Sequence, residues 1–579
     1  MQMERLEAKK INNNIYYYYS SWAWKDGKCR RVWQKYLGKP ENILRAVEAG
    51  GASPLYAEVF QWGLPLALWK ESQIADIISN TDLFSPKRKQ GLTTGEYLSI
   101  AAINRAMSPN SKRSMWEWFS QTILLRLLPH ATSNSLTSQR FWDHMDRIDG
   151  DKPLEIWQTI LKGVVKREEI DLSSVSYDGT NFYTFIDTFN TRCQIAKRGK
   201  NKQGRTNLRQ ISYALFCCAD GHLPLYYDIY EGNRNDAKQF PLMLKKFQNL
   251  LEDISKETGT PYKSPQVTLI FDKGNNSADN FSLLDSQELS YVGSVKLEEH
   301  KELAGISNHD KRFSPCNEEK LESTKAFRVK KRVYGKERVL VVTYNQNLFN
   351  TQYLTIQNDI AKAMEKLSIK QRQLEDRANG LIKGGKAPTK DLIERQYKKI
   401  LSRQYMKNII KVSLQENRAG NLLLDYSIDS DAFTELMDTY LGKNIIITDR
   451  EDWDNSRIVK AYRSQFIIEN VFKEMKDRDN GSWWPLHHWT DSKIRVHALY
   501  CTIALLLRAL MYRKVRLQRV NVSMKRFMTE LDGIREVVNI YKPKRGQKKQ
   551  PQQTVLTKTS PLQQQLIEIL NIRMEENPF

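Results

Sequence analysis

The chain has 579 residues, with 90 Lys and Arg against 67 Asp and Glu, a net charge of +23 and a pI of about 9.5. This length exceeds what one hydrophobic core supports and predicts about three or four structural units, which is ample for an enzyme. The basic balance predicts a polyanionic partner, with nucleic acid as the leading candidate rather than a small-molecule substrate.

Membrane insertion and secretion are not expected. The longest apolar run, from 498 to 507, ends at Arg508, well short of the ~20 residues that a membrane span requires, so it predicts a buried helix. The N-terminus begins MQMERLEAKK, which lacks the apolar stretch of a signal peptide. The six cysteines show no C-x-x-C pairing, and the histidines at 487, 488 and 497 lack cysteines at zinc spacing. We therefore expect reduced thiols, no structural zinc, and a cytoplasmic, nucleoid-associated protein.

The first 165 residues contain two different patterns. Residues 1–50 include IYYYYSSWAWKDGKCRRVWQKYLGK, whose aromatic runs flank a Lys-Asp-Gly turn and predict a small β module with a hairpin. Residues 51–165 have helical patterning, and Thr93 or Thr94 is an expected N-cap. Two interpretations of this helical region remain open: a DNA-end-binding region, or ordinary packed helices with solvated charges.

An α/β pattern follows over residues 170–297. Three aromatic and β-branched strands are predicted between 172 and 231, then a helix from 236 to 254, a fourth strand ending at 272 and a fifth from 291 to 296. Acids lie on the first and fourth strands. This order is typical of a ribonuclease H-like core, a mixed sheet flanked by helices, which we expect to resume over 441–515.

Between these two parts of the core, residues 298–440 are expected to form an insertion. It begins β-rich, with a turn at 334–336, and continues as a helical hairpin broken near 379–390. Residues 351–410 hold 13 Lys and Arg against 6 acids, which suits either a phosphate-facing surface or a solvated helix pair. After the core, a helical and flexible basic tail is expected over 516–579, because 541–553 is rich in Lys, Pro and Gln.

Three carboxylates are the candidate catalytic groups. Asp272 ends the buried run LIFD before Lys-Gly-Asn-Asn, Asp178 lies in VSYDGTNFY, and Glu469 lies on a predicted helix from Asp454 to Asp477. Each has an ordinary alternative, as a turn residue, a hairpin residue or a flanking surface charge. Jointly, two Asp on neighbouring central strands and a Glu on a helix predict a site for two Mg²⁺ ions, with Mn²⁺ as an alternative, suited to phosphoryl transfer.

The surroundings of Glu469 carry a family resemblance. The chain resembles the DDE transposases of prokaryotic insertion sequences that are marked by a Tyr-x2-Arg-x3-Glu-x6-Lys signature. Tyr462, Glu469 and Lys476 match it, whereas the arginine position is Gln465 and the nearest arginine is Arg463. On one continuous helix, residues seven apart lie about 20° short of two full turns, so the three matching residues would share a face and Arg463 would lie about 120° away.

The resemblance implies a metal-dependent enzyme that binds transposon ends as a homodimer, hydrolyses a phosphodiester, and joins the freed 3′-hydroxyl to target DNA. The residues that it places against DNA are Tyr462, Arg463, Gln465, Lys473 and Lys476. Three tryptophans behind the acidic helix are expected either to pack in the core or to stack on an extruded base: Trp483, Trp484 and Trp489. The alternatives are a metal-dependent nuclease on the same core without strand transfer, and a domesticated DNA-binding descendant.

Overall fold

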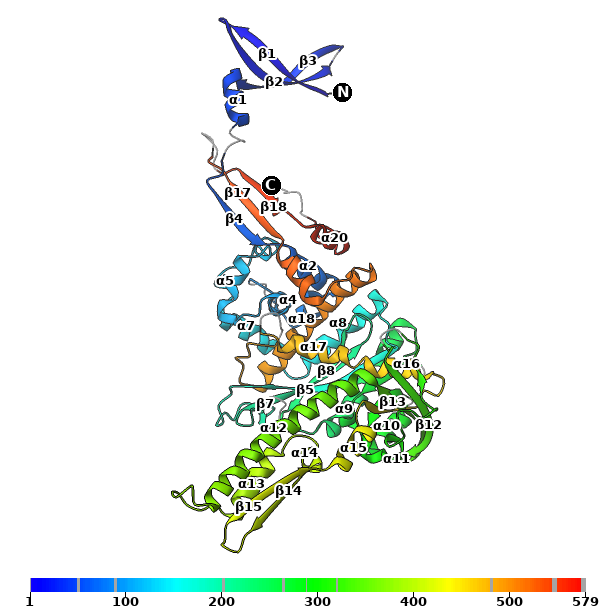
Figure 1. The fold of residues 1–579 in the computed structure, drawn as a ribbon. Helices are drawn as coiled ribbons and strands as arrows, with labels where there is room; N and C mark the ends of the chain where they lie inside the picture. The colour runs from blue at the N-terminus through cyan, green and yellow to red at the C-terminus, as the bar shows by residue number, and fades with distance from the viewer. Residues whose placement is uncertain are drawn as a thin grey trace. The chain divides into compact units, whose positions relative to one another are not determined.

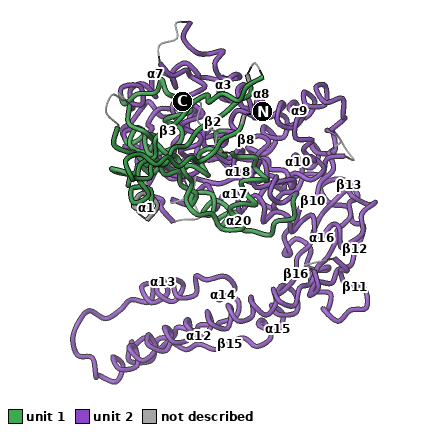
Figure 2. Tube along the Cα trace, turned by 90° about the horizontal axis from the view of Figure 1, so that it is seen from above, with its two compact units in different colours: residues 1–69, 114–133, 518–579 green, residues 70–113, 134–517 purple. Residues whose placement is uncertain are grey.

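The computed structural model describes the chain in ten stretches. They are residues 2–25, 27–48, 53–87, 91–199, 204–262, 266–287, 289–318, 321–478, 483–543 and 549–573. The chain divides into two compact units, which are distinguished by colour in Figure 2. Unit 1 holds residues 1–69, 114–133 and 518–579, and unit 2 holds residues 70–113 and 134–517.

Unit 1 contains two three-stranded antiparallel sheets. The first has the order β1 (Gln2–Ile11), β2 (Asn14–Lys25) and β3 (Lys28–Gly38), and is followed by α1 (Pro40–Glu48). The hairpin between β2 and β3 confirms the prediction, whereas β1 was not expected. The second sheet has the order β18 (Gln552–Leu556), β17 (Arg535–Ile540) and β4 (Tyr56–Gln61).

The expectation of a flexible arm over 541–553 is wrong at its end, because Gln552 and Gln553 pair with Ile540 and Asn539 of β17. Residues 544–548 of that arm lie outside the described stretches. The backbone hydrogen bonds of an antiparallel pair do not depend on a hydrophobic sequence, so the Lys, Pro and Gln bias did not reveal the strand. Helices complete unit 1: α5 (Met115–Ser120), α6 (Leu124–Leu127), α19 (Met524–Asp532) and α20 (Pro561–Ile569).

Unit 2 is built on a mixed ten-stranded sheet. The strands in spatial order are β11 (Ser314–Pro315), β12 (Thr324–Val333), β13 (Lys336–Asn345), β16 (Lys443–Thr448), β10 (Ser290–Val295), β9 (Thr268–Phe271), β5 (Ser174–Tyr183), β7 (Arg209–Cys218) and β6 (Lys197–Arg198), with β8 (Pro224–Glu231) also paired to β7. Strands β5, β9 and β10 run parallel, and the other pairs are antiparallel. The predicted run of three strands, a helix and two further strands is confirmed.

Helices cover both faces of this sheet (Figure 1). On one face, the ring of Phe240 in α9 (Asp236–Thr258) lies 5.0 Å from that of Tyr177 on β5 and 5.3 Å from that of Phe271 on β9. On the other face, Tyr213 of β7 shares a hydrogen bond of 2.9 Å with Thr502 of α18 (Asp491–Leu517). Side chains that alternate with Tyr177 along β5 therefore face α18 and its neighbours.

The remaining helices of unit 2 pack around this framework. They are α2 (Gly63–Ile74, which begins in unit 1), α3 (Ile77–Asp82), α4 (Thr94–Met107), α7 (Ser138–Met145), α8 (Lys152–Glu168), α10 (Ala278–Ser286) and α11 (Lys301–Ala304). Thr93 caps α4 and forms a reciprocal capping box with Glu96, as its sequence predicts. Helix α18 is long and apolar enough to cross a membrane by length and composition, yet 94% of its apolar window is buried inside the protein.

The single helix predicted from Asp454 to Asp477 is wrong. The structure has two helices, α16 (Asn455–Arg463) and α17 (Phe466–Lys476). At the break, the Ser464 side chain donates to the Ala461 carbonyl over 2.6 Å, and the Gln465 amide donates to the Tyr462 carbonyl over 3.3 Å. Such i to i−3 bonds tighten and bend a helix. The prediction that Tyr462 lies on the same helix face as Glu469 assumed one continuous helix, so it does not apply here. Glu469 and Lys476 still lie on one helix, α17.

Residues 346–442 of unit 2 form a group of elements that share one hydrophobic cluster. It contains α12 (Gln346–Ala378), α13 (Lys390–Ile400), α14 (Met406–Ile409), the antiparallel pair β14 (Ile410–Glu416) and β15 (Leu422–Ile428), and α15 (Ser430–Thr439). The predicted helical hairpin around 379–390 is present, and a hydrophobic cluster that includes the fully buried Leu367 holds these elements together. By contrast, β12 and β13 lie within the range expected to interrupt the core, yet they extend the central sheet through β16.

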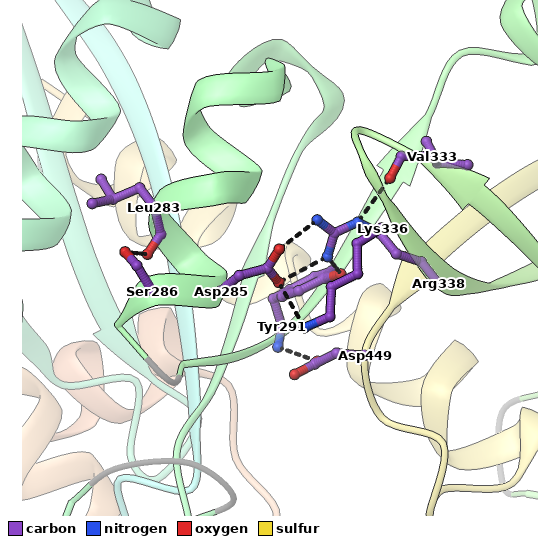
Figure 3. A network of polar contacts seen from close by, with 8 residues as sticks. All are labelled: Leu283, Asp285, Ser286, Tyr291, Val333, Lys336, Arg338 and Asp449. Carbon is purple, nitrogen blue, oxygen red and sulfur yellow. Dashed lines mark hydrogen bonds and ion pairs between the residues drawn. The ribbon is translucent and has the colours of Figure 1, made fainter.

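A buried arginine fixes this extension of the sheet (Figure 3). The Arg338 side chain on β13 is 1% exposed and donates twice to the Asp285 carboxylate of α10, over 3.0 and 2.8 Å. It also donates to the Tyr291 hydroxyl of β10 and, over 3.0 Å, to the Val333 carbonyl. A buried guanidinium whose donors are used in this way joins α10, β10 and β13.

We predict that Arg338→Met lowers the free energy of unfolding by about 3 kcal/mol, because Asp285 loses its buried bidentate partner. Urea unfolding followed by circular dichroism measures the loss. Lys336→Gln is the matched control, because its side chain is 64% exposed and its ammonium lies 3.6 Å from the same carboxylate. The control should change the free energy by less than about 0.5 kcal/mol. Equal losses of unfolding free energy in the two variants would contradict the structural role given to the buried Arg338–Asp285 pair.

Candidate active site

The pairing of two parallel strands brings Asp178 and Asp272 side by side. Strand β5 pairs with β9 in a register whose last partners are Tyr177 and Phe271. The residue that follows each of these partners is an aspartate, so Asp178 and Asp272 occupy neighbouring positions where β9 ends. Asp272 has extended backbone angles, with φ −85° and ψ 159°, so it continues the alternation of the strand.

Both carboxylates project from the face opposite α9. Tyr177 and Phe271 pack on Phe240 of α9, and the residue after each must point the other way. Ile270, two residues before Asp272, confirms this, because it packs in one cluster with Ile458 and Tyr462 of α16. Asp178 is half-buried and Asp272 is exposed, so the site is open to a large substrate.

Helix α17 covers β5 on the same face. The Lys476 ammonium donates to the Thr180 hydroxyl, and Thr180 lies two residues beyond Asp178 on the same side of β5. Glu469 is exposed two turns earlier on α17, on the side of the helix that Lys476 occupies. The helix thus brings one carboxylate and one ammonium to the face of the sheet that carries the aspartates.

Tyr462 lies near this group of charges. Burial raises the pKa of its hydroxyl, hydrogen bonds with Ser294 and Asn444 oppose that rise, and the negative charges of Asp272 and Glu469 add to it. The charge of Asp272, at the end of β9, and the charge of Glu469, on α17, therefore both affect the hydroxyl of Tyr462 on α16. A neutral Tyr462 hydroxyl beside two acids can donate a hydrogen bond but carries no charge at neutral pH.

The other three residues predicted to contact DNA, Arg463, Gln465 and Lys473, differ in their partners and in their burial. Arg463 donates to the Thr324 hydroxyl of β12 over 2.7 Å, and burial lowers its pKa. It therefore reaches away from Glu469. Gln465 is half-buried at the break, where its carbonyl accepts from the Glu469 amide over 3.3 Å. Lys473 is exposed on α17.

The carboxylate oxygens of Asp178, Asp272 and Glu469 meet some of the requirements of a site for a hard divalent cation. Aspartate and glutamate supply the oxygen ligands that Mg²⁺ prefers, and two of them lie at adjacent register positions. Among the described residues, however, no three His, Cys, Asp or Glu side chains are grouped closely enough to hold a metal ion. The arrangement thus offers a pair of aspartates, with Glu469 on the neighbouring helix as a third carboxylate.

The three predicted tryptophans differ in burial. Trp483 is fully buried and stacks on Phe182 of β5 with ring centroids 4.1 Å apart. Trp484 is 9% exposed and lies 4.6 Å from the Tyr183 ring, whereas Trp489 is 47% exposed with the Arg192 guanidinium 5.4 Å from its ring. Packing is therefore the role of Trp483, and Trp489 alone of the three offers a largely open ring.

A groove of about 580 Å³ lies beside these rings. Its lining includes Phe185, Asn190, Arg478, Trp484, His487 and Trp489. Arg478 donates to the Tyr183 hydroxyl over 2.6 Å, and sequence reasoning missed it although it follows Lys476 by two residues. The sequence signal for this surface is a run of aromatic residues from 182 to 189 followed by basic residues at 192, 197 and 198.

Comparison with known proteins gives a family match over the region that carries this site. Residues 174–507 match the family described as "Transposase DDE domain", a span of more than half the chain that includes Asp178, Asp272 and Glu469. No curated protein matches the chain in sequence. Among solved structures, piggyBac transposase in a synaptic complex with hairpin DNA is 10% identical, with 81% of this chain and 79% of that chain covered and a TM-score of 0.35. Mos1 transposase in a paired-end complex with the left transposon end is 12% identical, with coverages of 36% and 60% and a TM-score of 0.14.

We predict that Trp483→Ala lowers the free energy of unfolding by about 3 to 5 kcal/mol, because it leaves a cavity beneath Phe182. Trp489→Ala should change it by less than about 1 kcal/mol, because half of that ring is already in water. Chemical denaturation of the two variants in parallel provides the test. A small loss for Trp483→Ala would show that its ring is not part of the core.

Proposed function

Because the chain belongs to the transposase family defined by the DDE domain, we propose that it is a cut-and-paste DNA transposase. It binds the ends of its element, hydrolyses a phosphodiester bond to free a 3′-hydroxyl, and joins that hydroxyl to target DNA. Asp178, Asp272 and Glu469 are the proposed catalytic and metal-binding residues. The observation that carries the proposal is the neighbouring placement of the two aspartates, on the sheet face that α17 covers, within the family-matched region.

Two Mg²⁺ ions, or Mn²⁺, are the proposed cofactors, because the paired aspartates supply the oxygen ligands that these ions prefer. Asp178 and Asp272 would share one ion between adjacent strands, and Glu469 would complete the set when DNA brings its phosphate oxygens to the site. Bound ions of this kind stabilise the negative charge of the phosphoryl transition state. Because Asp272 is exposed, a duplex can approach it without displacing the sheet.

The chain's own cations position the DNA in this proposal. Lys476 holds its ammonium at Thr180, beside Asp178, where a phosphate flanking the scissile bond would lie. Lys473 is exposed on the same helix, and the Tyr462 hydroxyl lies near the two acids. We propose that two further residues contact the DNA strand farther from the cut. They are Gln465, at the break between α16 and α17, and Arg463, which lies beside β12. Such contacts fix orientation without reading sequence.

The wider assembly is also part of the proposal. A homodimer holds two transposon ends, and residues 51–165 recognise them. Residues 351–410 add a second basic surface, and Trp489 is proposed to stack on an extruded base beside the groove. No membrane or small-molecule substrate is involved, and the protein acts on nucleoid DNA in the cytoplasm.

We predict that Asp272→Asn reduces cleavage of labelled DNA carrying the element's own ends by at least about 1,000-fold in Mg²⁺, while end binding persists. The amide keeps the shape of the side chain and removes its charge, which the metal requires. Gel assays measure cleavage and joining, and binding is scored in parallel.

Asp279→Asn is the matched control, because it makes the same charge change at an exposed acid seven residues later in α10. It should cut like the wild type. If Asp272→Asn also cuts like the wild type, Asp272 is a turn residue and the proposed site is wrong. If the wild type cuts but never joins, the protein is a nuclease on this core, and if it binds without cutting in either metal, it is a DNA-binding descendant.

A further inference from the structure

The first sheet of unit 1 has two chemically different faces. Side chains alternate along β2, so Tyr16, Tyr18, Ser20 and Trp22 lie on one face, which we call the cation-ring face. The register adds Arg5, Glu7 and Lys9 from β1, and Arg31, Gln34 and Tyr36 from β3. The opposite face carries Leu6, Tyr17, Tyr19 and Trp33, together with the basic residues Lys10, Arg30 and Lys35.

Cations lie over the rings of the cation-ring face. The Arg5 and Arg31 guanidinium groups are 4.8 and 5.8 Å from the Trp22 ring centroid. The Lys9 ammonium is 4.8 Å from the Tyr18 ring, and the Lys39 ammonium is 5.8 Å from the Tyr16 ring. The rings therefore hold four positive charges over one side of the sheet.

The Glu7 carboxylate on this face accepts hydrogen bonds from four neighbouring side chains. Glu7 accepts hydrogen bonds from Arg5 over 3.0 Å, Ser20 over 3.1 Å, Trp22 over 2.8 Å and Gln34 over 3.2 Å. These bonds help to hold the pKa of Glu7 below its usual value against the opposing effect of desolvation, so it stays ionised and offsets a single positive charge. Lys9, Arg31 and Lys39 remain as the excess charge of the face.

This surface is open to solvent. Tyr36 is 55% exposed and the Arg5 side chain is 52% exposed. Over residues 1–39 the sequence has nine Lys and Arg against three acids, together with eight aromatic residues. A basic surface with interleaved aromatic residues is typical of nucleic-acid binding.

We propose that the cation-ring face is a binding site for the phosphate backbone of duplex DNA. Tyr16 and Trp22 are six residues apart on β2, so the cations span about 20 Å along the strand. Duplex DNA carries one negative charge per about 1.7 Å of its axis, so several phosphates lie within that span. Because cations occupy the ring faces, bases cannot stack there without displacing them, and this favours backbone contact over the stacking of single strands.

The proposal does not depend on the carboxylate site, since the sheet contains none of the catalytic residues. Its test compares the full-length wild type with two triple variants. One removes charge from the cation-ring face (Lys9→Gln, Arg31→Gln and Lys39→Gln), and the other removes equal charge from the opposite face (Lys10→Gln, Arg30→Gln and Lys35→Gln). Binding of a labelled 30-base-pair duplex of arbitrary sequence, and of one of its single strands, is measured across a salt series.

We predict that the cation-ring variant weakens duplex binding by at least about 10-fold at 0.1 M salt. It should also reduce the slope of log affinity against log salt by about 2 to 3, because each lost phosphate contact contributes about 0.9. The opposite-face variant should bind within about 2-fold of the wild type, since its charges face away from the DNA.

A third variant, with Lys9→Arg, Arg31→Lys and Lys39→Arg, keeps the charge and should restore binding. Equal weakening by both neutralised variants would show that net charge alone matters and would overturn the proposal. So would unchanged duplex binding, a loss confined to the single strand, or failure of the charge-preserving variant to bind. Cleavage by Asp272→Asn is measured separately, so failure of the catalytic proposal is distinguishable from failure of this one.

Discussion

The in-register parallel pairing of β5 with β9 is the constraint on which the candidate site depends. A slip of one residue would turn Asp178 or Asp272 toward Phe240 and bury a carboxylate against aromatic rings. Packing opposes that slip, because Tyr177 and Phe271 both contact Phe240, and both would have to leave the core. The hydrophobic face of the strands thus sets the position of the acids on the other face.

Local sequence was enough to predict the framework of this site. The predicted first strand contains Asp178, as β5 does, and the apolar part of LIFD ends at Phe271, the last residue of β9. Contacts distant in sequence were not predictable in this way. Strand β13 joins the core sheet through β16, about a hundred residues later, and the break at Ser464 depends on a side chain that bonds the preceding turn. Trp483 and Trp489 differ in burial because only Trp483 meets Phe182.

The positive charge of the chain serves two purposes that composition cannot separate. Arg338 and Arg508 are buried against carboxylates, with Arg508 3.2 Å from Glu474, so each ties secondary-structure elements together. Lys476 and Arg478 bond to Thr180 and Tyr183 at the edge of the site instead. A net charge of +23 therefore overstates what is available to DNA, and burial decides which cations can meet a phosphate.

Phosphate contacts provide affinity without sequence information, because every nucleotide presents the same backbone. A backbone-binding sheet at the N-terminus would therefore raise the local concentration of DNA without choosing the transposon end. Choice of the end then requires base contacts elsewhere, and residues 51–165 are the proposed place for them. Affinity from the sheet would fall steeply with salt, whereas discrimination between end and unrelated duplex would persist, since base contacts release no condensed counterions.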